Sequence, residues 1–426
     1  MNISVSFYTI GCRLNQAETA ILQQAFEKEG FQYIRFGNPS DIVVVNTCTV
    51  TEHGEAGTRK VVNKIRRNNP NARIALIGCQ AQTQKEKLMG LPGVQWVIGN
   101  AVKMDLPAIL KENLNNPLLL APRIPRDNFT IPVAGIDRKH TRANLKIQDG
   151  CDFFCTFCEI PFARGRARSR EFDDILKGAN ILANAGHREV VLTGINIGTY
   201  NDKGRDLIDV INALEKIPEL LRIRITSVEA TTFPVELLAN MDENHKLCRF
   251  LHISLQSGCN RILQLMNRKY TTDEFAEFLL LAHKTVKDIC LGTDVIVGFP
   301  GETDSDFEET FEYLKSLPFN YFHVFSYSDR DFNKSRKFPD KVPVEKIKKR
   351  NSILRELSRQ KRVKYLQSHV GKTEHVLFEH EKKGFWNGVT DTYIRVNVKS
   401  DSDLHNRFLP VRIESVNDQE VIGTLV

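Results

Sequence analysis

Long apolar runs are missing from this chain of 426 residues. A membrane-spanning helix needs roughly eighteen consecutive apolar residues. No stretch approaches that length, so neither a membrane span nor a membrane partner is predicted. Residues 1–10 also lack the basic region and the cleavage site of a signal peptide, and their pattern is that of a strand. Both absences predict a cytoplasmic protein.

A reducing compartment changes the interpretation of the nine cysteines, because clustered thiols there are more often metal ligands than disulfide partners. Cys151, Cys155 and Cys158 follow the spacing CxxxCxxC. Thiolates this close together suit zinc or an iron–sulfur cluster. A four-iron cluster with three protein ligands would leave one iron open for chemistry. The alternatives are a structural zinc knuckle and three core cysteines.

The chain is long enough for two or three domains, and its pattern predicts an α/β multidomain protein. Residues 1–137 alternate short apolar runs with helical patterns, which predicts an open, doubly wound parallel sheet. The expected strands are 4–9, 41–46, 73–77 and 96–98, and the expected helices are 15–29 and 55–68.

Three further cysteines lie at equivalent places in this first domain. Cys12, Cys48 and Cys79 each come just after an expected strand. Ligands of open parallel sheets bind beyond the carboxyl ends of the strands, so these thiols should converge there. We expect a second cluster with three cysteine ligands and an open iron. The alternative is three separate buried cysteines, which are common in proteins.

Residues 138–366 form the second expected domain, after a proline-rich linker at 118–132. Strand and helix patterns alternate six times. The expected strands are 144–148, 189–193, 222–226, 250–255, 293–297 and 321–325. Six such units predict a partial (β/α)6 barrel with its site at the carboxyl ends of the strands.

Polar residues and glycines follow most of these strands and suit a nucleoside. The candidates are Thr193, Gly194, Asn196, Glu229, Gln256 and Gly298. Gly194 and Gly298 lack a Cβ, so backbone can approach an adenine or ribose closely. Glu229 would accept hydrogen bonds from ribose hydroxyls. Ordinary turn chemistry is the alternative. His252, inside a strand, is expected to be a core or supporting residue.

A basic block follows the barrel pattern. Residues 330–364 contain fourteen Lys and Arg against four Asp and Glu, and 344–366 has the pattern of an amphipathic helix. Such a block favours a polyanionic partner, with nucleic acid the first candidate. Lys348, Lys349 and Arg350 are the expected RNA contacts. A solvated charged helix is the alternative.

Residues 367–426 form the third expected domain, where short alternating strands predict a small antiparallel β-barrel. Barrels of this kind often bind nucleic acid through aromatic and basic residues on one face. The candidates here are Trp386, Tyr393 and Arg395. Both aromatic residues would instead pack the small core if the barrel does not bind RNA.

The motifs resemble known families. Gly150 to Gly165 resembles the cluster loop of radical S-adenosylmethionine (SAM) enzymes. Segments 9–18, 46–50 and 78–82 resemble the three cysteine motifs of the N-terminal domain of methylthiotransferases. Within that family, residues 11–18 are most similar to the branch that acts on N6-threonylcarbamoyladenosine in tRNA (the MtaB type). Segments 384–388 and 391–396 resemble the RNA-binding TRAM domain.

This resemblance implies a tRNA-modifying transferase that replaces the C2–H of the modified adenine next to the anticodon by C–S–CH3. Two [4Fe-4S] clusters and SAM are the implied cofactors. The cluster on Cys151, Cys155 and Cys158 would pass an electron to SAM, and the other would hold the sulfur. Motif matches at 252–258 and 295–302, together with the aromatic before the third cysteine, add Phe157 and Ile296 to the expected SAM contacts. The implied partners are a tRNA anticodon stem-loop, an electron donor and a sulfur donor.

The sequence departs from the family pattern at three places. Cys259 replaces a small polar residue, Ala230 replaces a proline, and residues 331–337 replace a Pro-Gly-Thr-Pro-Ala segment. Three other functions stay open. They are methylthiolation of N6-isopentenyladenosine in tRNA, methylthiolation of a ribosomal-protein aspartate, and a non-enzymatic iron–sulfur RNA sensor.

Overall fold

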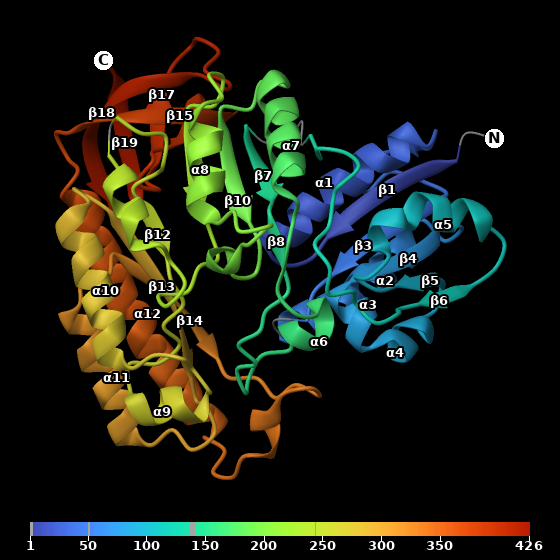
Figure 1. Cartoon of the computed structure of the whole chain (residues 1–426), viewed down its shortest axis with the longest axis horizontal. Coiled ribbons are helices and arrows are strands. Elements are labelled where there is room, and N and C mark those ends of the chain that lie inside the picture. Colours follow the sequence, from blue (N-terminus) through green and yellow to red (C-terminus); the bar gives the residue numbers. More distant parts are fainter. Residues whose placement is uncertain (1–2, 50–51, 137–140, 243) are drawn as a thin grey trace.

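The computed structural model describes residues 3–49, 52–136, 141–242 and 244–426. Strand pairing divides them into an N-terminal sheet, a central barrel and a small C-terminal barrel (Figure 1). The predicted α/β fold class is therefore confirmed. The predicted boundary between residues 137 and 138 lies outside the described residues, and that between 366 and 367 falls at the end of a long helix. No helix within the described ranges is long and apolar enough to cross a membrane.

The N-terminal sheet has the strand order β2-β1-β3-β4-β5-β6, with every pair parallel. Its strands are β1 (Ser4–Thr9), β2 (Gln32–Tyr33), β3 (Ile42–Thr47), β4 (Arg73–Gly78), β5 (Val94–Ile98) and β6 (Leu118–Leu120). Its helices are α1 (Arg13–Lys28), α2 (Glu52–Asn68), α3 (Cys79–Thr83), α4 (Lys85–Met89), η1 (Lys103–Asp105) and α5 (Leu106–Glu112). The predicted linker is wrong at its start, because β6 extends the sheet there.

Each face of this sheet carries its own apolar core, as a doubly wound sheet requires. Leu22 and Phe26 of α1 pack with α5 against one face. Val62 and Ile65 of α2 pack with α3 and α4 against the other. Consecutive residues of each strand point to opposite faces, so strands buried on both sides are apolar almost throughout, as β3 is.

The central unit contains six parallel strands. They are β7 (Arg142–Lys146), β10 (Glu189–Thr193), β11 (Arg222–Ile225), β12 (Phe250–His252), β13 (Cys290–Val297) and β14 (Tyr321–Ser326). Its helices are α6 (Ile160–Arg164), α7 (Phe172–Asn184), η2 (Ile197–Thr199), α8 (Leu207–Glu215), η3 (Val235–Asn240), α9 (Asn260–Leu265), α10 (Thr272–Thr285), α11 (Asp304–Ser316), η4 (Lys334–Lys337) and α12 (Val344–Gln367). A short pair, β8 (Gln148–Asp149) with β9 (Arg168–Ser169), flanks the Cys151 loop.

These six strands form a partial barrel. Two three-stranded sheets, β11-β10-β7 and β12-β13-β14, are joined by the parallel bridges Ile223–Leu247 and Val228–Ile253. Within the described part of the chain, no strand pair joins β14 back to β7. The incomplete barrel predicted from the six repeats is confirmed. β12 is shorter than expected, because the Leu255 amide donates to the Thr293 side chain at 2.9 Å instead of to a strand carbonyl.

The C-terminal unit is a closed barrel of order β15-β16-β17-β19-β18. Its strands are β15 (Thr373–Lys382), β16 (Phe385–Val389), β17 (Arg395–Lys399), β18 (Phe408–Asn417) and β19 (Glu420–Leu425). Four strand pairs are antiparallel, while β17 and β19 pair in parallel. The small barrel predicted from the sequence is confirmed, with this one parallel pair added.

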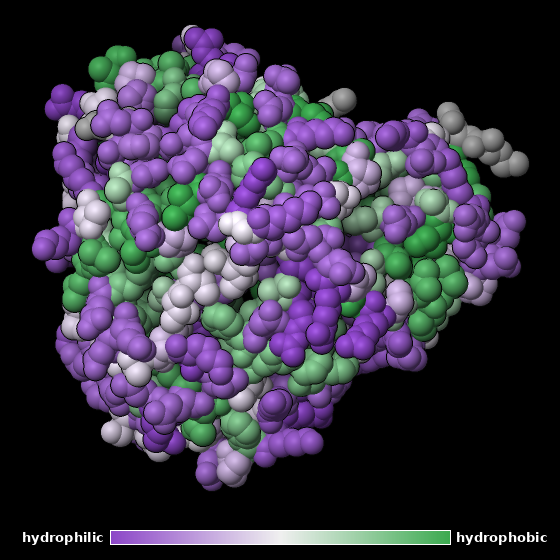
Figure 2. Space-filling view, in the orientation of Figure 1, coloured by the Kyte–Doolittle hydropathy of each residue, from purple (hydrophilic) through white to green (hydrophobic). Residues whose placement is uncertain are grey.

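Hydrogen bonds join this small barrel to the amino ends of the central strands. Arg222, the first residue of β11, donates to the Val389 carbonyl at 2.7 Å, and Arg142 of β7 donates to Glu379 at 2.8 Å. Arg249, just before β12, donates to Asp391 at 2.7 Å. The small barrel therefore does not cover the carboxyl ends of these strands, where Lys146 of β7 instead meets Glu18 of the N-terminal domain. On the face shown in Figure 2, hydrophilic side chains predominate and apolar ones form only scattered patches.

Candidate active site

Sheet order brings Cys12, Cys48 and Cys79 to one edge of the N-terminal sheet. They follow β1, β3 and β4, which are neighbours, with Thr47 in register with Gly78. Cys48 and Cys79 are buried and Cys12 is exposed. A Cβ on Gly11 would lie 2.7 Å from Cys48 Sγ, and the φ of Gly11 is +105°. Only glycine allows Cys12 and Cys48 to approach in this way.

Amides fix the loops that carry these thiols. Asn15 Nδ2 donates to the carbonyl oxygens of Ile10 at 2.8 Å and Thr47 at 3.0 Å, which joins the ends of β1 and β3. Asn100 Nδ2 lies 3.7 Å from Cys79 Sγ and donates to the Ala163 carbonyl at 2.6 Å. Because Ala163 belongs to α6, just after the Cys151 loop, Asn100 joins the two cysteine sets.

A buried charged network, which we call the seam, holds the N-terminal sheet against the barrel. It consists of Glu18, Lys103, Lys146, Asp149 and Arg164, all nearly inaccessible to solvent. Arg164 Nη1 donates to Glu18 and to Asp149, each at 3.0 Å. Lys146 Nζ donates to the same two carboxylates at 2.8 and 2.7 Å, and Lys103 pairs with Glu18.

The seam contains three cations and two anions, so the carboxylates stay ionised although they are buried. Burial would raise the pKa of Glu18, but Arg164, Lys103 and Lys146 hold it well below its usual value. Burial also lowers the pKa of Lys103 to about 8. Arg164 Nη2 donates to Asn15 Oδ1 at 2.6 Å, so the cationic end of the seam adjoins the loops of Cys12 and Cys48. That excess of positive charge suits neighbouring thiolates.

The second set, Cys151, Cys155 and Cys158, lies on one half-buried loop. The φ of Phe154 is 50°, and Asn267 Nδ2 accommodates this turn by donating to the Phe154 carbonyl at 3.1 Å. Arg268 Nη1 lies 3.4 Å from Cys155 Sγ. Burial raises the pKa of Cys151 to about 11, so these thiols need a bound cation to become thiolates. Three such thiols on one turn fit a cluster with an open iron.

A cavity of about 380 Å³ lies beside the Cys151 loop and extends to the residue after Cys48. Its lining includes Cys158 and also Thr49, which follows Cys48. The rest of the lining comes from the Cys158 turn, β13, β14 with its following loop, and α12; it consists of Phe157, Glu159, Ile160, Gln256, Asp294, Ile296, Val324, Phe325, Ser326, Tyr327, Ser328, Arg330 and Arg355. A molecule in this cavity would therefore contact Cys158 of one set and Thr49, the neighbour of Cys48 in the other set, whereas Cys12, Cys48 and Cys79 do not line it.

The predicted SAM contacts divide into two groups. Phe157, Gln256 and Ile296 line the cavity. Thr193 and Asn196 are buried at the end of β10, outside that lining. Their Oγ1 and Nδ2 atoms have no hydrogen-bond partner among the described residues, as expected where a polar ligand completes the site.

Glu229, Gly194 and Gly298 have other surroundings. Glu229 is ion-paired with Arg268, although burial raises its pKa. A Cβ on Gly194 would lie 2.8 Å from the side-chain oxygen of Gln148, and one on Gly298 would lie 2.3 Å from Ile347. At both glycines protein side chains fill the space that a Cβ would occupy, so packing alone requires glycine there, and the approach of a nucleoside to the backbone stays a prediction.

The atypical segment 331–337 packs directly on the Cys151 loop. Asn333 Nδ2 donates to the Phe157 carbonyl at 2.6 Å, and the Ser335 amide donates to the Thr156 carbonyl at 3.0 Å. The rings of Phe332 and Phe162 are 5.5 Å apart. This segment therefore covers the loop, although its sequence departs from the family pattern.

Two of the expected RNA contacts have partners within the protein. Arg350 is buried and pairs with Glu302 and Asp304. The ring of Tyr393 lies 4.6 Å from that of Phe250, and Arg13 donates to its hydroxyl at 2.8 Å. Burial and its ion pairs keep Arg350 from an RNA partner, whereas Tyr393 is only half-buried, so its contact with RNA stays a prediction.

The other expected RNA contacts stay at least partly accessible. Lys348 and Lys349 are exposed on α12, and Arg395 is exposed on β17. Trp386 is half-buried and packs against the core of the C-terminal barrel.

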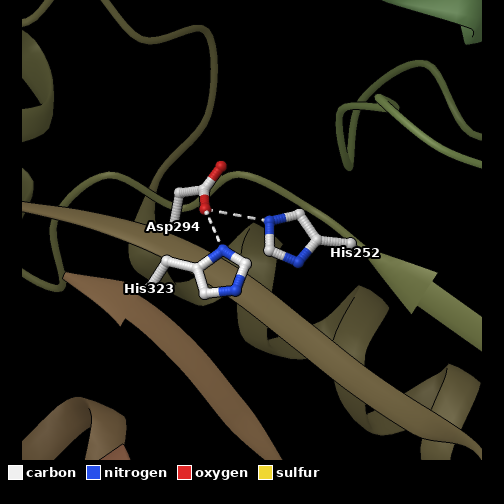
Figure 3. A group of neighbouring side chains, drawn as sticks. All are labelled: His252, Asp294 and His323. Atoms are coloured by element: carbon white, nitrogen blue, oxygen red, sulfur yellow. Dashed lines mark hydrogen bonds and ion pairs between the residues drawn. The ribbon is translucent and has the colours of Figure 1, made fainter. Parts of the chain in front are cut away.

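Sequence reasoning missed the seam and a polar group inside the barrel. Glu18 carried a signal, because it stands midway between Leu14 and Leu22 on the buried stripe of α1. His252 Nε2 and His323 Nδ1 lie 3.0 and 3.2 Å from the same oxygen of Asp294 (Figure 3). These three come from β12, β13 and β14, and their spacing in sequence gave no signal that they meet.

Comparisons with known proteins agree with this geometry. Residues 145–314 match the radical SAM superfamily, and residues 4–99 match an uncharacterized protein family, UPF0004. The threonylcarbamoyladenosine tRNA methylthiotransferase MtaB of Aquifex aeolicus is 38% identical, over 92% of this chain and 96% of its own. That of Bacillus subtilis is 35% identical, over 96% and 93%.

Two further matches extend the comparison. The tRNA-2-methylthio-N(6)-dimethylallyladenosine synthase of Ehrlichia canis is 31% identical, over 97% of this chain and 98% of its own. Among solved structures, the radical S-adenosylmethionine methyltransferase TsrM of Kitasatospora setae matches with a TM-score of 0.57 at 16% identity, covering 79% of this chain and 77% of that one. At that identity the likeness concerns the fold alone.

Proposed function

The chain belongs to the radical SAM methylthiotransferases that modify tRNA, and we propose that its substrate position is C2 of N6-threonylcarbamoyladenosine next to the anticodon. The protein is a transferase of this family. Relatives named for threonylcarbamoyladenosine support the proposed substrate over dimethylallyladenosine, which the Ehrlichia relative is named for. Modification of a ribosomal protein is disfavoured by the exposed basic residues of α12.

The observation that carries this proposal is one cavity that touches the Cys151 loop and also the residue next to Cys48. Thr49 beside Cys48 and Cys158 of the other set line one space of about 380 Å³. A base that enters this space would lie between a site that activates its C–H bond and a site that delivers sulfur. A sensor that only bound RNA would need no cavity joining the two sets.

Two [4Fe-4S] clusters and SAM are the cofactors of this family, and they supply the radical, the sulfur and the methyl group. Cys151, Cys155 and Cys158 would hold one cluster, and Cys12, Cys48 and Cys79 the other. An electron donor and a sulfur donor must reload them.

The remaining residues position these groups. The seam fixes the spacing between the cysteine sets through Arg164 and Asn15. Phe157, Gln256 and Ile296 bound the side of the cavity next to Cys158 and would contact SAM. Thr193 Oγ1 and Asn196 Nδ2, which find no partner in the described part of the chain, would offer hydrogen bonds in the barrel. The segment 331–337 packs on the Cys151 loop and would hold that loop in place.

The RNA would lie across α12 toward the cavity. Lys348 and Lys349 are exposed there, while Trp386 and Arg395 offer contacts on the small barrel. Basic side chains such as these bind phosphates without reading sequence. An anticodon loop presents unpaired bases that can be turned out into a pocket, whereas a duplex cannot.

Anaerobic reconstitution tests the proposal. Protein loaded with iron and sulfide, then reduced with dithionite, should cleave SAM and convert an anticodon stem-loop carrying N6-threonylcarbamoyladenosine to its 2-methylthio form. Mass analysis of the nucleosides measures the product, and the same stem-loop with N6-dimethylallyladenosine is the control. Preferred modification of the dimethylallyl RNA would show that this RNA is the substrate instead. Failure to cleave SAM would contradict the proposed enzymatic activity.

A further inference from the structure

Arg355 on α12 is an exposed cation at the mouth of the cavity. It lines the cavity and also an open groove along α12 formed with Lys348, Ser352 and Arg359. It makes no hydrogen bond or ion pair with any residue that the structure describes. The adjacent Glu356 is occupied, since Arg359 donates to it at 2.9 Å and Gln360 at 3.0 Å. A guanidinium in this position has its donors available for an incoming anion.

Most of the cavity wall is apolar, but Asp294 gives it one charged, hydrogen-bonded part. Asp294 lines the cavity, accepts hydrogen bonds from His252 and His323 through Oδ1, and accepts one from Ser254 at 3.3 Å through Oδ2 (Figure 3). These histidines hold the pKa of Asp294 low although burial raises it. His323 points away from the core, with 59% of its side chain exposed. A hydrocarbon placed here would strip water from charged groups without replacing its hydrogen bonds.

We propose that Arg355 binds a carboxylate on the N6 substituent of the adenine, so that the cavity selects an anionic substituent over a hydrocarbon one. This assignment rests on the proposed function. The planar fork of a guanidinium matches a carboxylate with two parallel hydrogen bonds. Sites built to hydrogen-bond a polar group reject analogues that lack it far more strongly than apolar pockets reject a size difference. The threonylcarbamoyl group carries such a carboxylate and the dimethylallyl group does not.

Two RNAs and three variants test this role. One stem-loop carries N6-threonylcarbamoyladenosine, and the other carries N6-(2-hydroxypropylcarbamoyl)adenosine, which lacks only the carboxylate. In reconstituted holoenzyme, Arg355→Gln should lower kcat/KM for the first RNA about 10- to 100-fold, the loss of a charged hydrogen-bonded pair. The second RNA should be modified about equally by both proteins. Arg355→Lys should recover part of the loss.

Arg359→Gln is the matched control. It removes the same charge one turn along α12, from a residue that lines the groove but not the cavity. Because Arg359 would contact phosphates alone, Arg359→Gln should change kcat/KM for both RNAs by the same factor. SAM cleavage without RNA should be unchanged in Arg359→Gln, because Arg359 does not line the cavity.

Three results would overturn the assignment. If Arg355→Gln lowered kcat/KM equally for both RNAs, Arg355 would be a phosphate contact. Arg355→Gln that stops SAM cleavage would place Arg355 at the cofactor. Wild-type holoenzyme that cleaves SAM and modifies neither RNA would overturn the proposed function, and this assignment with it, whereas the first two results leave the proposed function standing.

Discussion

The two cysteine sets are built in different ways. Cys151, Cys155 and Cys158 lie on one loop, whose own turn brings them together. Cys12, Cys48 and Cys79 are spread over the first domain and meet only because β1, β3 and β4 are neighbours in the sheet. The first set is a product of local sequence, and the second is a product of topology.

Different forces stabilise the two sets as a result. The Cys151 loop is held by single hydrogen bonds, such as those from Asn267 and Asn333. The other set depends on strand register and on the buried seam, which ties it to the barrel. Damage to the loop should therefore act locally, while damage to the seam should act on the relation between the domains.

The largest expected effect is the loss of both reactions in Cys151→Ala. Without its third thiolate the loop cannot hold the SAM cluster, so SAM cleavage and methylthiolation should both fall to background. High-performance liquid chromatography of SAM products and nucleoside mass analysis measure the two reactions. Cys248→Ala, at a buried cysteine outside both sets, is the matched control. Retention of SAM cleavage in Cys151→Ala would contradict the assignment.

Cys79→Ala should separate the reactions. The loop cluster remains, so reductive SAM cleavage should persist while methylthio product disappears and bound iron falls by about half. Iron analysis and the same two assays detect this. If Cys79→Ala abolished SAM cleavage as fully as Cys151→Ala, the two sets would not have separate tasks.

Breaking the seam should destabilise the fold. Glu18→Gln leaves Arg164 and Lys103 buried without their shared carboxylate, at a cost of about 3–5 kcal/mol. Urea denaturation of the apoprotein measures the loss. Glu29→Gln removes an exposed carboxylate paired with Lys111 just after the same helix and should produce no measurable change. Equal midpoints for the two variants would show that the seam adds no stability.

The stabilisation of the fold by the seam should also depend on pH in the acid range. The folded pKa of Glu18 is well below its ordinary value of 4.5, so its stabilisation is complete above about pH 4.5 and is lost as the pH falls through the folded pKa. The difference in unfolding free energy between wild type and Glu18→Gln should therefore shrink on acidification. A constant difference between pH 7 and pH 3 would contradict this sign.

The two cysteine sets also differ in how directly the sequence predicts them. The spacing of Cys151, Cys155 and Cys158 is visible in one line of sequence. Convergence of Cys12, Cys48 and Cys79 required one rule, that parallel strands end at a common edge, and the sheet order confirms that these strands are adjacent. Both predictions concern backbone placement, which hydrophobic patterns determine well.

Side-chain partners were harder to predict. Gly298 lies in a motif, yet its missing side chain makes room for Ile347. Arg350 belongs to the basic block, yet it pairs with Glu302. Asp294 and His323 meet because β13 and β14 align in register, which no local spacing shows. Such contacts depend on which strands pair and on helix placement, so only the assembled fold reveals them.

Helix α12 sets a distance that the RNA must match. It starts near Gly298, where Ile347 fills the space beside the carboxyl end of β13, and it ends where the small barrel begins. A helix of 24 residues is roughly 36 Å long. The cavity reaches α12 at Arg355, near the middle of the helix, so roughly 18 Å of helix separates the cavity from the small barrel. Free nucleosides and short oligonucleotides are too short to contact both the cavity and the small barrel. A folded stem-loop is long enough to contact both at once.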